Sequence, residues 1–219
     1  DEFDDYAESH PMEGMPLAVA GLTDSEFTTI RQWLEQGAPL EPKIITPTNE
    51  EQQLIADWEA FLNQRDLKHQ LVARWLYEHL FLAHLYLDKG QDSKPAHFFK
   101  LHRSSTPPGE PIKPVATDRP NGMPPENFWY RIAPVPGTLV HKTHITFGLA
   151  KDKLARTKEH FFSTDWSVET LPGYGYEQRA NPFVTFSAIP ARARYQFMLD
   201  EAEYFVRTFI RGPVCRGQV

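Results

Sequence analysis

Histidine side chains are the first groups to consider, because imidazole is a common metal ligand and can act as an acid or a base near neutral pH. The sequence holds nine of them. His79 and His84 are five residues apart, which on a helix turns them about 140° away from each other, whereas a helical zinc site needs a spacing of four. His141 and His144 are three apart, which on a strand points them to opposite faces. These spacings favour core or surface histidines over a dedicated zinc site.

A methionine near the start offers a different chemistry. Met15 precedes a proline and lies seven residues before Leu22. Thr23 and Glu26 then form a capping box for a short amphipathic helix over residues 24–36. This arrangement resembles the closing half of a c-type cytochrome domain, in which a Met-Pro loop supplies the sixth haem ligand and the last helix packs over the haem. The alternative is a plain methionine in a proline-rich loop before a capped helix.

The other reactive groups indicate less. Cys215 is the only cysteine, so these residues can form neither an internal disulfide nor a Cys-x-x-Cys-His haem attachment motif, and we interpret it as structural. No nucleophile elbow, phosphate-binding loop or dinucleotide fingerprint is present. Arginines gather near the last predicted helix, where they either complement the helix dipole or bind a carboxylate or phosphate head group. They are Arg192, Arg194, Arg207, Arg211 and Arg216.

The composition is that of a folded protein with an acidic balance. Hydrophobic residues make up 41% and charged residues 24% of the chain, and the net charge is −6. Because there is no basic block, we do not expect nucleic acid as a partner. The richest apolar run, residues 71–87, contains charged side chains and predicts a buried core helix, not a membrane span. The chain starts without methionine or a signal peptide and stops shortly after a predicted helix, so we expect an internal piece of a larger protein.

Hydrophobic periodicity and stop signals divide the chain into two parts. Three prolines within residues 39–47 indicate a linker, so we predict one domain over 1–40 and a second over 41–219. Thr48 and Glu51 form a second capping box. The predicted fold class is mainly α with some β (α+β). The predicted helices are 24–36, 49–63, 67–87, 151–162 and one from Pro190 to Gly212, and the predicted strands are 97–103, 128–132, 139–147 and 183–186.

Longer stretches of the sequence resemble the fatty acid cis/trans isomerases of Gram-negative bacteria. The similarity covers essentially the whole chain, and the strings that carry it are long enough to be specific. They are 73–86 (ARWLYEHLFLAHLY), 127–132 (NFWYRI), 141–144 (HKTH), 181–183 (NPF), 194–200 (RYQFMLD) and 209–218 (FIRGPVCRGQ). Members of this family are longer than 219 residues and carry their haem attachment motif upstream of the part that matches this chain.

The resemblance implies a periplasmic enzyme with haem c that converts cis-unsaturated fatty acids of membrane lipids to trans isomers without shifting the double bond. Ferric haem would draw electron density from the double bond, and Met15 matches the axial ligand of the iron. The partner would be an unsaturated fatty acid or a phospholipid acyl chain, met peripherally at the membrane surface. The resemblance gives no secure catalytic assignment. The candidates are Tyr77, Glu78, His79 and His84 for the pocket, and Arg194, Arg207 and Arg211 for the substrate head group.

Two other functions stay open at this point. One is an electron-transfer cytochrome of the c type with an appended α+β domain, and the other is a haem-free lipid-binding module. Trp75, Leu80 and Phe81 could wall an acyl slot, but they suit a plain core equally well. We expect this stretch of chain to be inactive by itself, because the residues that attach haem lie outside it.

Overall fold

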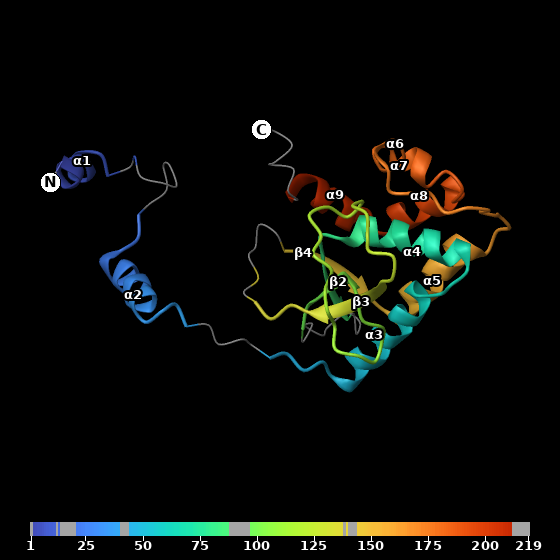
Figure 1. The fold of residues 1–219 in the computed structure, drawn as a ribbon, viewed down its shortest axis with the longest axis horizontal. Coiled ribbons are helices and arrows are strands. Elements are labelled where there is room, and N and C mark those ends of the chain that lie inside the picture. The colour runs from blue at the N-terminus through green and yellow to red at the C-terminus, as the bar shows by residue number, and fades with distance from the viewer. Residues whose placement is uncertain are drawn as a thin grey trace. The chain divides into compact units, whose positions relative to one another are not determined.

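The structure is a computed structural model that describes residues 2–11, 13, 21–39, 44–87, 97–137, 139 and 144–211. It divides into two compact units, Asp1–Pro42 and Lys43–Val219, each of which is described by itself (Figure 1). Helices combine with a four-stranded sheet in the second unit, which confirms the predicted mixture of α and β structure. The assignment of residues 1–40 to a cytochrome c-like domain stays a prediction, because Met15 lies outside the described residues.

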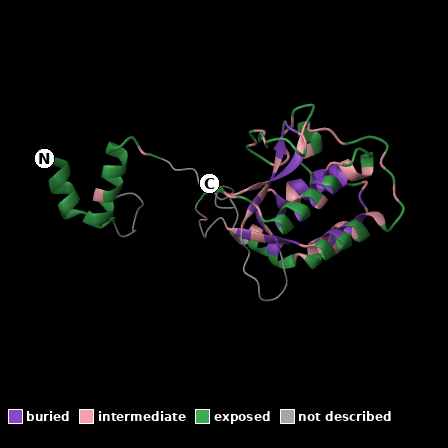
Figure 2. Cartoon of the chain, turned by 90° about the horizontal axis from the view of Figure 1, so that it is seen from below, coloured by how far each residue is buried: buried purple, intermediate pink, exposed green. Residues whose placement is uncertain are grey.

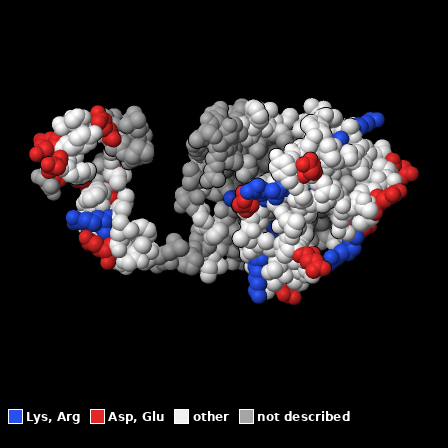
Figure 3. Space-filling model, turned by 45° about the horizontal axis from the view of Figure 1, so that its top comes forward, with Lys and Arg blue, Asp and Glu red and all other residues white. Residues whose placement is uncertain are grey.

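The described part of the first unit contains two helices without a buried residue (Figure 2). α1 spans Glu2–Ser9 and carries acidic side chains in its first turn (Figure 3). α2 spans Asp24–Glu35 and begins at the predicted capping box. The Thr23 hydroxyl accepts the Glu26 backbone N–H at 3.3 Å, and the Glu26 carboxylate accepts the Thr23 N–H at 2.8 Å. The apolar side chains that α2 leaves exposed are Phe27, Ile30, Trp33 and Leu34.

The second unit is built on a sheet with the strand order β3-β2-β1-β4 (Figure 1). β1 pairs antiparallel with β2 and parallel with β4, and β2 pairs antiparallel with β3. The strands are β1 Ala83–Leu87, β2 Phe99–Ser104, β3 Trp129–Pro134 and β4 Ile145–Leu149. The last three confirm the strands predicted over 97–103, 128–132 and, in its described part, 139–147.

Alternation along the strands gives this sheet an apolar face, which the helices cover. Leu85, Leu101 and Ile132 are buried there, and Phe147 contacts aromatic rings of α8 and α9. α3 packs against α4 and β3, α4 against β2, and α9 against β4. The helices of this unit are α3 Asn49–Leu62, α4 Leu67–Leu80, α5 Lys151–Phe162, α6 Tyr176–Arg179, α7 Pro182–Thr185, α8 Ala191–Asp200 and α9 Ala202–Arg211.

The predicted helix over residues 67–87 is wrong beyond Leu80. The chain turns at Phe81, and Ala83 begins β1. A run that is apolar on most sides suits a buried helix and a central strand equally well, so periodicity cannot separate the two. Pairing with β4, which comes much later in the sequence, decides in favour of a strand.

Two predictions near the C-terminal end are also wrong. The strand predicted over 183–186 is the short helix α7, because the Asn181 side chain caps it and Pro182 takes its first helical position. The single helix predicted after Pro190 is divided at Glu201 into α8 and α9. Neither glycine nor proline marks that division.

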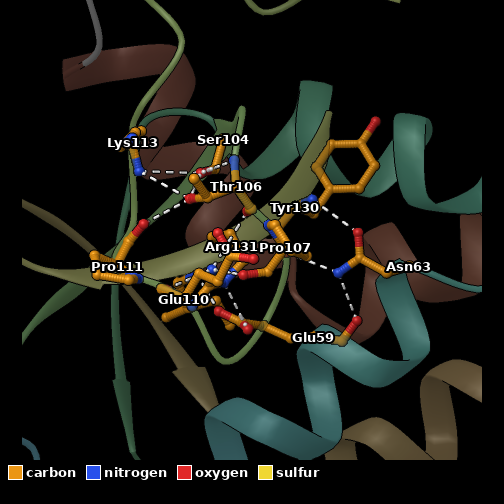
Figure 4. A network of polar contacts seen from close by, with 11 residues as sticks. Glu59, Asn63, Ser104, Thr106, Pro107, Glu110, Pro111, Lys113, Tyr130 and Arg131 are labelled. Carbon is orange, nitrogen blue, oxygen red and sulfur yellow. Dashed lines mark hydrogen bonds and ion pairs between the residues drawn. The ribbon is translucent and has the colours of Figure 1, made fainter. Parts of the chain in front are cut away.

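A buried polar network joins α3 and β3 to the loop after β2 (Figure 4). The Glu59 carboxylate accepts the Arg131 Nε–H at 2.9 Å and the backbone N–H of Ile132 at 2.7 Å. The Asn63 side chain donates to the Tyr130 carbonyl at 2.8 Å and accepts the Tyr130 N–H at 2.9 Å. Arg131 also donates to backbone carbonyls of the loop, those of Thr106, Pro107 and Glu110. The network therefore fixes β3, and the residues just before it, against α3.

Candidate functional site

A pocket of about 200 Å³ opens between the end of α3, the start of α4 and the segment that leads into β3. Its wall combines apolar and aromatic side chains with a few polar and charged ones. The lining residues are Leu62, Asn63, Gln64, Arg65, Gln70, Leu71, Arg74, Glu126, Asn127, Phe128, Trp129, Tyr130, Leu171, Pro172 and Tyr174. Such a mixture is typical of a site that holds an apolar ligand by one polar end.

Arg74 on α4 is the buried cation of this wall, with 4% of its surface exposed. Its Nε donates to Glu78 one turn later at 2.8 Å, and its Nη1 donates to the carbonyls of Pro172 at 2.6 Å and Gly173 at 3.1 Å. The ring of Tyr174 stacks on the guanidinium, with Cζ 3.7 Å from the ring centroid. Nη2 is buried and has no hydrogen-bond partner among the described residues.

A second buried guanidinium lies behind the first. Arg103 on β2 is 1% exposed, and its Nη1 donates to the Gly122 carbonyl at 2.8 Å. Its Cζ lies 4.4 Å from the Tyr77 ring centroid, 5.4 Å from that of Tyr174 and 5.5 Å from that of Phe128. The hydroxyl of Tyr174 approaches Arg103 closely enough to interact with it. No hydrogen bond of normal geometry reaches Nε or Nη2 from the part of the chain that the structure describes.

Glu78 is the carboxylate that faces both guanidinium groups. Burial raises the pKa of Glu78, and the hydrogen bond and charge of Arg74, together with the charge of Arg103, oppose that rise. The neighbouring phenols do not add negative charge, because burial raises the pKa of each of them. These phenols are Tyr77, Tyr130 and Tyr174. The buried cluster therefore contains two guanidinium cations and one carboxylate.

The structure places three of the four predicted pocket residues on α4 but only two of them in this cluster. Tyr77 is buried under Arg103, and Glu78 pairs with Arg74. His79 stacks on Trp75, and its Nδ1 donates to the Trp75 carbonyl at 2.7 Å. Burial lowers the pKa of His79, and this hydrogen bond opposes the lowering. Whether Tyr77 or Glu78 takes part in catalysis stays a prediction.

His84, the fourth, lies on β1 and not on a helix, so the helical spacing argument does not apply to it. Its Nδ1 lies 2.8 Å from Nδ1 of His144, the residue before β4, with which it shares a hydrogen bond. Burial, with the charge of Lys100 and the second histidine, lowers the pKa of His84 to about 4. This pair was not predicted from the sequence, because it is the parallel alignment of β1 with β4 that brings the two histidines together.

The predicted head-group arginines come from α8 and α9. Arg194 on α8 contributes to the lowered pKa of His79 and has a buried Nε without a partner among the described residues. Arg207 pairs with Glu203 at 2.7 Å on the exposed side of α9. The side chain of Arg211 lies outside the described residues, and so does Met15. These assignments stay predictions.

Among the described residues, no three His, Cys, Asp or Glu side chains come together in a way that could hold a metal ion. No described helix combines the length and the apolar character needed to cross a membrane.

Comparison with known proteins adds one clear finding. Neither the curated proteins nor the solved structures include a match to this chain. A family model described as fatty acid cis/trans isomerase matches residues 1–219, which confirms the resemblance drawn from the sequence strings. Because that match spans the entire sequence, the chain belongs to the fatty acid cis/trans isomerase family.

Proposed function

We propose that this chain serves a periplasmic, haem-dependent isomerase that converts cis double bonds in the fatty acids of membrane lipids to trans without moving them. The family match supports isomerisation of fatty acids. The observation on this chain that carries the proposal furthest is the pocket beside Arg74, where aromatic and aliphatic walls meet a buried cation. A free unsaturated fatty acid has the same two parts, an apolar chain and an anionic end, whereas the acyl chain of a membrane lipid is a neutral ester and would use the apolar wall alone.

The haem part of the proposal rests on Met15 and α2. Bound haem would supply a ferric iron that draws electron density from the double bond and so eases rotation about it. Met15 would hold the iron through its neutral thioether sulfur. The structure offers a test of fit on α2, because its apolar side chains, Phe27, Ile30 and Leu34 among them, are exposed and lack a partner to pack against within the described residues. A porphyrin face is an apolar surface that would cover them.

The activity can be tested in cells. Bacteria that express the gene encoding this chain are compared with bacteria that carry an empty vector, and their fatty acid methyl esters are separated by gas chromatography. We expect trans-unsaturated acids to appear at the expense of cis acids with the double bond at the same carbon. Haem-containing protein without any trans product would contradict the isomerase and favour the electron-transfer cytochrome. The periplasmic fraction should contain the protein.

Met15 can be tested by spectroscopy, independently of activity. In haem-containing protein, Met15→Ala should remove the thioether ligand and change the absorption bands that report axial ligation. Met12→Ala is the matched control, because it removes the same side chain three residues earlier. An unchanged spectrum in Met15→Ala together with a changed spectrum in Met12→Ala would assign the ligand to Met12.

A further inference from the structure

We propose that Arg74 and Arg103 form an anion-binding subsite at the inner end of the pocket, and that this subsite takes the carboxylate of a fatty acid. The assignment rests on the proposed function for the identity of the ligand. The evidence for an anion site is independent of it and comes from charge, burial and hydrogen bonding of the residues around the two guanidinium groups.

The charge balance is the first step. Two guanidinium groups, 4% and 1% exposed, share the single carboxylate of Glu78. The pocket lining adds Arg65 and Glu126, whose opposite charges cancel. The described residues therefore leave a net positive charge that is largely shielded from water, and a buried charge is unfavourable unless a counter-ion joins it. A bound anion would complete the balance.

The unpaired nitrogens are the second step. Arg74 Nη2, Arg103 Nε and Arg103 Nη2 are all buried without a hydrogen-bond partner among the described residues. Guanidinium N–H groups match the two oxygens of a carboxylate, which is why arginine predominates where a planar anion is bound. Tyr174 lines the pocket and its ring lies near both cations, whereas Arg103 does not line the pocket, so binding to Arg103 requires a lining side chain such as Tyr174 to move.

The size of the pocket is the third step. About 200 Å³ lies below the range of roughly 300–1,000 Å³ that is usual for a site enclosing a whole small-molecule ligand. A carboxylate and the first few carbons of an acyl chain would suit the space, against the apolar side chains of Leu62, Leu71 and Phe128. A phospholipid would bring a bulkier phosphate ester and a second chain, so the space favours a single free acid.

The experiment is a calorimetric titration of the complete chain at neutral pH with sodium palmitoleate, its methyl ester and inorganic phosphate. We expect palmitoleate to bind, and the ester, which has no negative charge, to bind at least tenfold more weakly. Arg74→Gln should weaken palmitoleate binding about 10- to 100-fold, because charge-assisted hydrogen bonds are lost. Arg74→Lys, which keeps the charge without the planar fork, should recover only part of the affinity.

Arg156→Gln is the matched control. It makes the same chemical change on an exposed arginine that pairs with Asp200, so palmitoleate affinity should stay within twofold of the original protein. Arg74 also holds the carbonyls of Pro172 and Gly173, so circular dichroism must show that Arg74→Gln is folded. If it is not, Arg103→Gln is titrated instead and should show the same loss.

The outcomes separate this inference from the proposed function. Equal binding of palmitoleate to the original protein and to the folded glutamine variant, Arg74→Gln or Arg103→Gln, would overturn the subsite, whatever the cells that express the gene produce. Equal binding of palmitoleate and its methyl ester would do the same. Competition by inorganic phosphate at the concentration at which palmitoleate binds would overturn the carboxylate assignment in favour of a general anion site. If the arginine variants lose palmitoleate binding while the cells that express the gene make no trans fatty acids, the subsite is supported and the isomerase is refuted.

Discussion

Replacing Glu59 by glutamine removes one negative charge from the centre of the network in Figure 4 and leaves the shape of the side chain unchanged. The oxygen that accepts the Ile132 N–H, 2.7 Å away, is kept. The ion pair with Arg131 is lost. In the original protein the Arg131 Nε and the Glu59 carboxylate oxygen are 2.9 Å apart, and the two side chains are only 8% and 6% exposed. The new amide N–H faces the Arg131 Nε–H, so two donors meet and the guanidinium keeps only carbonyl oxygens as partners.

The expected loss of stability is large. Removing one partner of a buried ion pair costs about 3–5 kcal/mol, since the other charge is left buried and unpaired. Domains are stable by only about 5–15 kcal/mol, so this is a third or more of the total in many cases. For a unit of this size, it corresponds to a fall of roughly 6–20 °C in the unfolding midpoint. Burial raises the pKa of Glu59, although the Ile132 N–H and Arg131 both act to lower it, so the desolvation of this carboxylate outweighs the stabilisation by its partners.

Urea unfolding followed by circular dichroism measures the effect. Glu203→Gln is the matched control, because it makes the same substitution in an equally short ion pair, 2.7 Å from Arg207, whose side chains are 78% and 47% exposed. An exposed pair of this kind contributes no more than about 1 kcal/mol. If Glu59→Gln lost no more stability than Glu203→Gln, the network would not be what fixes β3 to α3, and the reasoning would be refuted.

Two further predictions concern other described contacts. Thr48→Ala removes the hydroxyl that accepts the Glu51 N–H at 3.2 Å at the start of α3. Urea unfolding should show a free energy of unfolding that is lower by about 1 kcal/mol. Thr208→Ala is the control, because it makes the same substitution away from any helix start, and it should change the free energy of unfolding less. Folding lowers the pKa of His84 from its usual 6.5 to about 4, so the neutral form is favoured in the folded state, and the stability it contributes falls as the pH drops from 6.5 toward 4. In His84→Gln, the decrease in the free energy of unfolding between pH 6.5 and 4 should be smaller by up to about 3 kcal/mol. An unchanged dependence of the unfolding free energy on pH would show that His84 is not buried as a neutral side chain.

Local signals in the sequence were sufficient for several helices. The capping boxes at Thr23 and Thr48 both form, with each hydroxyl accepting the N–H three residues on. The helix predicted over 151–162 is α5 with the same limits. Such elements are predictable because their start and stop depend on residues a few positions away.

Elements that depend on distant partners were not predictable. β1 exists because β2 and β4 pair with it on either side, and nothing in residues 83–87 by themselves excludes a helix. The candidate site has the same character. Little in the sequence around Arg74 distinguishes it from any other residue of a buried helix. Only the fold brings Arg103 and the segment at Tyr174 close to it. A polar stripe of Gln70, Arg74 and Glu78, at a spacing of four residues on a largely apolar helix, was the one available signal.

Two buried arginines of the sheet, Arg131 and Arg103, differ in how their charge and their N–H groups are satisfied. Arg131 has its own carboxylate in Glu59 and three loop carbonyls to accept its N–H groups. Arg103, which is buried more deeply, donates to one carbonyl, lies close to the hydroxyls of Tyr130 and Tyr174, and shares Glu78 with Arg74. The same small unit therefore gives one buried guanidinium a carboxylate of its own, and leaves the other with a shared carboxylate and two buried nitrogens that have no hydrogen-bond partner among the described residues. Since unsatisfied buried cations are costly, the difference is most simply explained by an anion that completes the set around Arg103 only when it is bound.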